Sequence, residues 1–179
     1  IFSYRCYWLI PKVVIQKAKL MALNFHPATP DYPGSGSYSW AIYNQAKEFG
    51  ITIHLMNDKY DSGKILDVHT FELHDDVNVE NLIKKSYKFS LISFKNFINK
   101  INNKSNEEIN KFKNAPSNFI WKGKAKTLSD LNKMRTIDLN ISKNELSKRI
   151  KAFHFKDYPI LLNINGFEFK LSLKDKKGY

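Results

Sequence analysis

The chain has 179 residues, 42% of them hydrophobic, and a formal net charge of +12 at pH 7. This length supports one substantial core, so we expect a main domain over residues 1–115 and a smaller C-terminal module over residues 116–179. The single cysteine, Cys6, excludes a disulfide framework or a cysteine zinc site within the chain and favours the reducing cytoplasm. We find neither an apolar run long enough for a membrane helix nor a secretory leader, and expect no membrane partner.

The positive charge is concentrated in one part of the chain. Residues 84–126 contain eleven lysines, no arginine and two acidic residues. Basic proteins bind nucleic acids by neutralising phosphates and releasing counterions. The same stretch is rich in asparagine and isoleucine, the composition that an AT-biased genome supplies. We therefore favour a solvated lysine-rich face and expect no specific nucleic-acid partner.

A strand and a short helix are predicted at the start of the chain. Residues 1–7 are typical of the end of a buried strand, and residues 12–17 of a short helix. The apolar run 20–23 leads into Asn24-Phe25-His26-Pro27. In a parallel sheet this polar cluster would lie at the carboxyl end of a strand, where α/β folds place their ligands.

The next segment is predicted as a loop followed by a helix. Residues 27–36 contain three prolines and two glycines, which forbid regular structure. A helix is expected over residues 38–48, capped by Ser37 or Ser39. Gly50 is expected to end it in the left-handed conformation.

A second strand, residues 51–56, leads to the second polar cluster, Asp61-Ser62-Gly63. In a parallel sheet this cluster would meet the first one. His54 lies on the same strand, and two interpretations stay open: it reaches the ligand pocket, or it is a hydrogen-bonded core histidine. His69 and His74 follow and lack the spacing of metal ligands, so we expect no metal.

The rest of the chain gives two strong local predictions. Residues 78–102 carry apolar residues at intervals of three and four, which predicts a long helix that packs on the sheet. Asn165-Gly166 predicts a hairpin between residues 159–163 and 167–173. The sequence assigns no clear order to residues 103–136, where Trp121 either stacks on a ligand ring or anchors the segment. A further helix is predicted after Ser142.

Several of these motifs together resemble one enzyme family. They are Asn-x-His from residue 24, Trp-Ala-Ile from residue 40, Gly-Ile-Thr-Ile-His-x-Met from residue 50 and Asp-x-Gly-x-Ile-Leu from residue 61. The pattern is similar to the formyltransferases that use N10-formyltetrahydrofolate. Members of that family formylate methionyl-tRNA, glycinamide ribonucleotide or an amino group on a nucleotide-linked sugar. The resemblance implies an α/β fold with a Rossmann-like sheet, whose N-terminal half precedes residue 1.

The resemblance assigns a catalytic trio to Asn24, His26 and Asp61. The chemistry agrees, because formyl transfer to an amine needs a proton acceptor and a stabilised oxyanion. His26 would take the proton, since its ordinary pKa lies near working pH. Asp61 would raise the pKa of the imidazole and orient it, and the Asn24 amide would donate to the formyl oxygen.

The resemblance also implies which residues bind the folate co-substrate. In similar enzymes two segments line the pterin, partly through backbone groups. They correspond here to Trp8, Leu9, Ile10, Asn57, Asp58, Lys59, Tyr60 and Asp61. The side chain of Trp8 alone would equally suit an ordinary core position.

Three departures from the family pattern guide the choice of substrate. The loop has Pro33-Gly34 where tRNA and arabinose enzymes carry Ser-Leu-Leu-Pro and then Arg-Gly. The C-terminal helix and hairpin are smaller than the barrel domain of the tRNA enzymes. Arg149 to Phe153 resembles the family's Arg-Ala-Phe signature at the edge of the nucleotide-sugar site, but the match is partial because Lys151 replaces arginine.

We therefore expect a formyltransferase acting on a nucleotide-linked amino-dideoxyhexose, such as dTDP-4-amino-4,6-dideoxyglucose, for O-antigen or another surface polysaccharide. N10-formyltetrahydrofolate would be the co-substrate, and a homodimer is left open. Methionyl-tRNA formyltransferase is the alternative that the positive charge favours. A catalytically silent basic RNA-binding protein is the second alternative, against which the intact trio argues.

Overall fold

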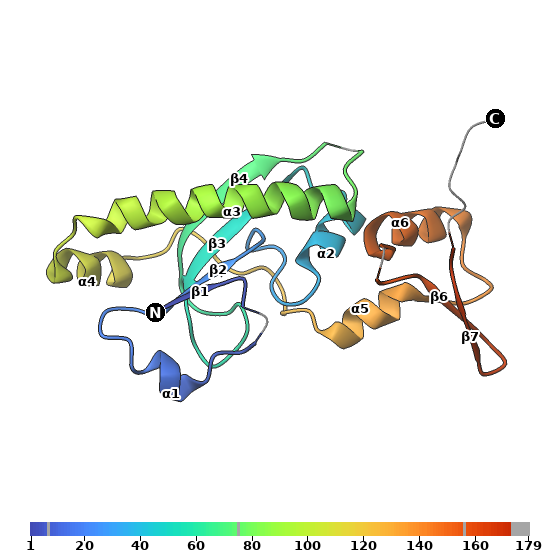
Figure 1. Ribbon diagram of the computed structural model, residues 1–179, viewed down its shortest axis with the longest axis horizontal. Coiled ribbons are helices and arrows are strands. Elements are labelled where there is room, and N and C mark those ends of the chain that lie inside the picture. Colours follow the sequence, from blue (N-terminus) through green and yellow to red (C-terminus); the bar gives the residue numbers. More distant parts are fainter. Residues whose placement is uncertain (7, 75, 156, 173–179) are drawn as a thin grey trace.

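The computed structural model describes residues 1–6, 8–74, 76–155 and 157–172. Its main sheet has four strands in the order β1-β2-β3-β4 (Figure 1). Their bounds are β1 (Phe2–Tyr4), β2 (Leu23–His26), β3 (Glu48–Leu55) and β4 (Ile65–Glu72). A short helix, α1 (Lys12–Ile15), lies between β1 and β2. The predicted α/β class is confirmed.

The sheet is mixed, so the assumption of parallel strands was wrong for its central pair. β1 and β2 are parallel, but β2 pairs antiparallel with β3, and β3 with β4. The connection between β2 and β3 is a loop followed by α2 (Ser37–Tyr43), and after it the chain runs antiparallel to β2. Asn24 lies within β2 and His26 is its last residue, at the carboxyl end where the cluster was expected. The antiparallel pairing places Asn24 opposite His54 of β3.

The predicted end of α2 was also wrong. The helix ends at Tyr43, and Gln45 takes the left-handed conformation with φ 54°. Gly50 lies inside β3 opposite Thr70, where an added Cβ would come within 2.0 Å of the His69 carbonyl oxygen. Close approach of two strands explains this glycine, not a helix end. Neither predicted serine caps α2, because its cap residue is Gly36.

The long helix is confirmed as α3 (Val79–Asn102), and the Asn78 side chain caps it by accepting from the Asn81 N–H. It lies across the main sheet (Figure 1). One core cluster joins the two: Met21, Leu23, Phe25, Ile51, Ile53, Phe97, Ile101 and Ile109. The last of these belongs to α4 (Asn106–Asn114), which the sequence did not predict, although Ser105 and Glu108 form a capping box.

The C-terminal part contains α5 (Leu128–Arg135), α6 (Lys143–Phe153) and a second sheet of β5 (Thr136–Ile137), β6 (Leu161–Ile164) and β7 (Phe167–Lys170). The predicted hairpin is confirmed, and Asn165 and Gly166 both have positive φ, as its turn requires. Helix α6 packs on α2, and the ring centroids of Phe153 and Trp40 are 5.1 Å apart. The boundary at residues 115 and 116 stays a prediction.

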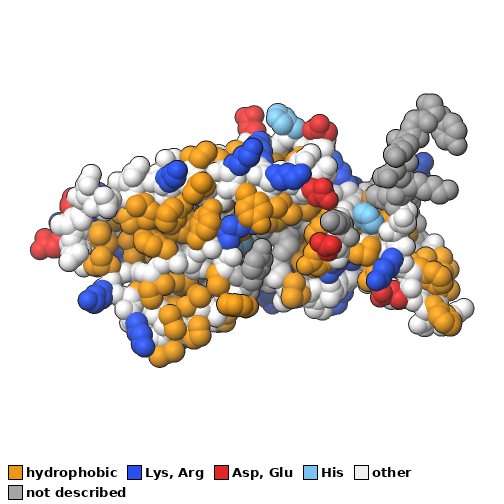
Figure 2. All heavy atoms as spheres, viewed as in Figure 1, with side chains coloured by type: hydrophobic (Ala, Val, Ile, Leu, Met, Phe, Trp, Pro, Cys, Tyr) orange, Lys and Arg blue, Asp and Glu red, His pale blue; other side chains and the backbone are white. Residues whose placement is uncertain are grey.

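Apolar side chains gather over α3 and the N-terminal segment on the face shown in Figure 2. Leu91 and Ile92 of α3 and Val13 of α1 are among the exposed large apolar residues. None of the helices in the described ranges is long and apolar enough to cross a membrane.

Candidate active site

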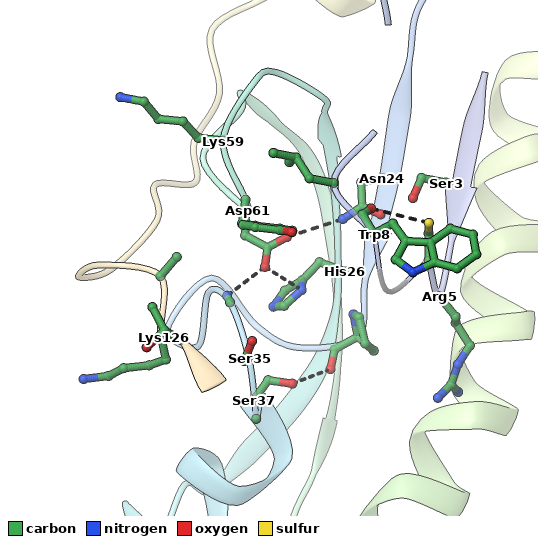
Figure 3. Close-up of a pocket in the computed structure, with 18 of the residues that line it drawn as sticks. Ser3, Arg5, Trp8, Asn24, His26, Ser35, Ser37, Lys59, Asp61 and Lys126 are labelled. Atoms are coloured by element: carbon green, nitrogen blue, oxygen red, sulfur yellow. Dashed lines mark hydrogen bonds and ion pairs between the residues drawn. The ribbon is translucent and has the colours of Figure 1, made fainter. Parts of the chain in front are cut away.

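The structure brings the predicted trio together around one carboxylate (Figure 3). Strand β2 supplies Asn24 and His26, and the connection between β3 and β4 supplies Asp61. Asp61 Oδ2 lies 3.1 Å from His26 Nδ1, and Asp61 Oδ1 accepts from Asn24 Nδ2 at 3.4 Å. The three side chains therefore meet as the resemblance implies, and their catalytic roles stay a prediction.

All three residues line a cavity of about 780 Å³. Of the predicted folate contacts, Trp8, Leu9, Ile10, Asn57, Lys59 and Tyr60 also line it. Asp58, which the structure describes, does not. Trp8 is 82% exposed, which excludes the core position. The cavity thus has an apolar wall from one segment and a polar wall from the other, a combination that fits a flat heteroaromatic ring with polar edges.

His26 is almost fully buried, and both of its ring nitrogens face acceptors. Nδ1 faces Asp61, and Nε2 lies 2.9 Å from the Tyr32 carbonyl oxygen. Burial lowers the pKa of the His26 imidazole below its ordinary value, while Asp61 and the Tyr32 carbonyl act in the opposite direction. Desolvation therefore favours the neutral imidazole. If the ring takes up a second proton, both of its N–H groups have an acceptor.

Asp61 is held by four groups in a strained backbone conformation, with φ 39°. Besides His26 and Asn24, the Gly34 N–H donates to Oδ2 at 2.7 Å, and His54 Nε2 lies 3.4 Å from Oδ1. Burial alone would raise the pKa of the Asp61 carboxyl. The positive charge that His26 carries when protonated, the neighbouring His54 and the Gly34 N–H together outweigh it and lower the pKa to about 2. Asp61 is therefore a carboxylate at neutral pH.

His54 lines the same cavity, and it stays a prediction that this cavity holds the sugar. The ring is buried at 2% exposure, and Nε2 lies 3.1 Å from Asn24 Nδ2. It is thus also a hydrogen-bonded buried histidine, and the two interpretations are not alternatives. If the antiparallel direction of β3 had been known, the alternation of side chains along the two strands would have placed His54 opposite Asn24 on the same face of the sheet.

Trp121 anchors its segment behind the two imidazoles. Its Nε1 donates to the Gly63 carbonyl at 2.7 Å, and its ring meets His54 and His26 edge-on at 5.0 and 5.7 Å. The residues after it bind the proline-rich loop: the Lys122 N–H donates to Pro30 O, and the Lys126 N–H to Pro33 O. This strap, residues 121–126, was not predicted as part of the site.

The partial signature on α6 lies away from the cavity, and no α6 residue lines it. Arg149 pairs instead with Glu145 at 2.7 Å, which also accepts from the Tyr43 hydroxyl, and Phe153 is buried in the core. Within the described ranges, no group of three or more His, Cys, Asp or Glu side chains is placed to hold a metal ion.

The family model described as formyl transferase matches residues 3–94, just over half of the chain. The chain belongs to the formyl transferase family. Its relatives include GDP-perosamine N-formyltransferase of Brucella melitensis biotype 1, 30% identical over 161 residues, which are 88% of this chain and 58% of that protein. This chain thus matches a little over half of that relative's length. Methionyl-tRNA formyltransferase of Hydrogenobaculum sp. is 33% identical over 78 residues, 43% of this chain and 26% of that protein.

Solved structures of other formyl transferases share the fold. A 4-N formyltransferase from Francisella tularensis superposes with a TM-score of 0.75 at 24% identity, covering 97% of this chain and 69% of that one. An N-formyltransferase from Helicobacter canadensis, solved with folinic acid and dTDP-3-aminofucose, gives a TM-score of 0.61 at 21% identity, covering 92% and 58%.

Proposed function

We propose that this protein transfers a formyl group from N10-formyltetrahydrofolate to the amino group of a nucleotide-linked amino-dideoxyhexose. The observation that carries the proposal is the meeting of Asn24, His26 and Asp61 at one cavity, in a member of the formyl transferase family. The relative that acts on GDP-perosamine matches along twice as much of the chain as the tRNA relative does. That extent supports a sugar over a tRNA.

The residues divide the chemistry as follows. The folate supplies a formyl group that the acceptor amine attacks, and the wall formed by Trp8, Leu9 and Ile10 would hold its ring. His26, which burial keeps neutral, takes the proton that the amine loses. For this, one ring nitrogen leaves its acceptor, either Asp61 or the Tyr32 carbonyl, and binds the amine instead. The acceptor that His26 keeps stabilises the imidazolium. The imidazolium returns its proton to N10 of the folate as the bond between N10 and the formyl carbon breaks and tetrahydrofolate leaves.

Methionyl-tRNA formyltransferase remains the second candidate, because the net charge of +12 favours a polyanionic substrate. However, the similarity to such enzymes is short, and it extends over 78 residues for the Hydrogenobaculum relative. A silent RNA-binding role is less well supported, since a strained, partly buried Asp61 between two histidines is typical of a working site.

A substrate panel tests the proposal. The protein is incubated with N10-formyltetrahydrofolate and, in separate reactions, GDP-, dTDP- and UDP-linked amino-dideoxyhexoses and methionyl-tRNA. We expect stoichiometric formylation of at least one amino sugar nucleotide and none of the tRNA. Efficient formylation of the tRNA alone would replace our proposal by the second candidate. A reaction without protein is the control for uncatalysed transfer.

A further inference from the structure

We propose that His54 is a positioning residue that sets the direction of the Asn24 side-chain amide. A proton on His54 Nε2 would turn the amide so that its hydrogens face the cavity. The catalytic consequence of this inference rests on the proposed function, whereas the hydrogen-bond arrangement does not.

The His54 ring is fixed from several sides. Nδ1 lies 2.9 Å from the Leu55 carbonyl, which only accepts, so Nδ1 carries a hydrogen. Gly63 packs so closely that an added Cβ would lie 1.7 Å from Leu55 O and 3.4 Å from His54 Nδ1. Trp121 covers the ring edge at 5.0 Å. With Nδ1 donating, the neutral ring presents Nε2 as an acceptor.

His54 Nε2 accepts one of the two hydrogens on Asn24 Nδ2, with the two nitrogens 3.1 Å apart. The other hydrogen is directed to Asp61 Oδ1, at 3.4 Å. Both amide hydrogens are therefore committed within the protein, and neither is left for a ligand in the cavity. An Asn24 in this orientation cannot donate to a formyl oxygen, which is the role that the resemblance assigns to it.

Turning the amide resolves this conflict only when His54 carries a second proton. The turn places Asn24 Oδ1 against Nε2 and Asp61 Oδ1, so with a neutral ring three acceptors would face one another. A proton on Nε2, exchanged with water, lets His54 donate to Asn24 Oδ1 and attracts the Asp61 carboxylate, already 3.4 Å away. The titratable groups that face His54 are Asp61 and, across it, His26.

Kinetics on single and double variants test the coupling. His54→Ala should lower kcat by about tenfold to a hundredfold with KM for the amino sugar nearly unchanged, because ground-state binding is kept. His54→Gln, which can both donate and accept, should recover part of the loss. In an Asn24→Ala background, His54→Ala should cost little more, since its partner is gone. The pH profile of kcat should lose one ionisation in both His54 variants.

His69 provides the matched control. It lies on β4 in the same sheet, pairs with Asp67 at 3.6 Å and does not line the cavity. His69→Ala should leave kcat and its pH profile unchanged. Additive losses from Asn24→Ala and His54→Ala, or an unchanged pH profile in the His54 variants, would overturn the inference and leave the proposed function intact.

A spectroscopic measurement needs no turnover. Nitrogen-15 NMR of the histidine rings should show neutral His54 protonated at Nδ1, and the Asn24 side-chain NH2 should exchange slowly with water. In His54→Ala that exchange should speed up at least about tenfold, as a buried hydrogen bond is lost. A neutral His54 protonated at Nε2, or an unchanged Asn24 exchange rate, would refute the arrangement even if the protein formylates no sugar.

Discussion

At the scale of single residues, Asp61 organises the site because its two oxygens serve different partners. Oδ2 receives His26 and the Gly34 N–H, whereas Oδ1 faces Asn24 and His54. One carboxylate thus orients both the expected proton acceptor and the expected oxyanion donor. Its left-handed φ of 39° shows that the backbone is held in a strained conformation to present it.

The lowered pKa of Asp61 predicts a loss of stability in acid. Between its ordinary value of 3.8 and about 2, the folded carboxyl stays ionised while the unfolded one takes up a proton. The unfolded state then binds more protons, so stability on the order of 2 kcal/mol is present above that range and is lost as pH falls through it. Denaturant titrations of wild type and Asp61→Asn from about pH 5 to about pH 2 measure this, and the variant should lose less. Asp58→Asn, at an exposed position, should behave as wild type.

His26→Ala should reduce turnover by about two to four orders of magnitude, the usual effect of losing a general acid or base. Affinity for the sugar nucleotide should stay nearly unchanged, because the buried ring meets the substrate only at the reacting amine. Steady-state kinetics with the best substrate of the panel, together with calorimetric binding, measure both quantities. Near-normal turnover would show that another group, with His54 the first to be tested, moves the proton.

At the scale of elements, local signals predicted well and long-range pairing did not. The apolar stripe of α3 and the Asn165-Gly166 turn depend on residues that are close together in the sequence, and both are confirmed. The direction of β3 against β2 and the place of Gly50 in a strand depend on contacts with distant residues. The trio could still be named, because its residue types and order survive in the sequence even when the pairing is unknown.

Gly50→Ala should be strongly destabilising, by roughly 2 kcal/mol or more, because its Cβ would lie 2.0 Å from the backbone of the neighbouring strand. Gly166→Ala is the comparison: nothing lies within 4 Å of its Cβ, so only its φ of 85° is unfavourable, at about 1 kcal/mol. Equilibrium unfolding of the two variants gives the difference. Equal effects would contradict the close approach of β3 and β4.

Trp121→Ala should loosen the strap of residues 121–126 and with it the loop that holds His26 and Asp61. The Trp121 N–H to Gly63 and the edge contacts with both imidazoles would be lost. We expect kcat to fall about tenfold to a hundredfold, through mispositioning rather than lost chemistry, and the Gly34 amide to exchange faster with deuterium. The neighbouring Ile120, 75% exposed, is the control, and Ile120→Ala should change neither quantity.

At the scale of the whole molecule, the lysines exposed on α3 and the cavity are separate features, although Arg5, Lys59 and Lys126 line the cavity. Lys84, Lys88 and Lys95 are exposed on α3 and do not line the cavity. The lysine-rich composition of residues 84–126 contributes most of the net charge of +12. A basic surface of this kind attracts polyanions without specifying a substrate.

RNA binding by this surface should therefore be weak, indifferent to sequence and steeply reduced by salt, because it depends on counterion release. Replacing Lys84, Lys88 and Lys95 together by glutamate should weaken RNA binding and flatten its salt dependence, while formylation of the amino sugar stays within about twofold. Fluorescence anisotropy with an unrelated RNA from about 50 to about 200 mM salt and the formylation assay, run on the same preparations, measure both. If the triple variant lost sugar formylation in parallel with RNA binding, the lysine-rich face would belong to the substrate site. A polyanionic acceptor, as in the tRNA enzymes, would then be favoured over a nucleotide sugar.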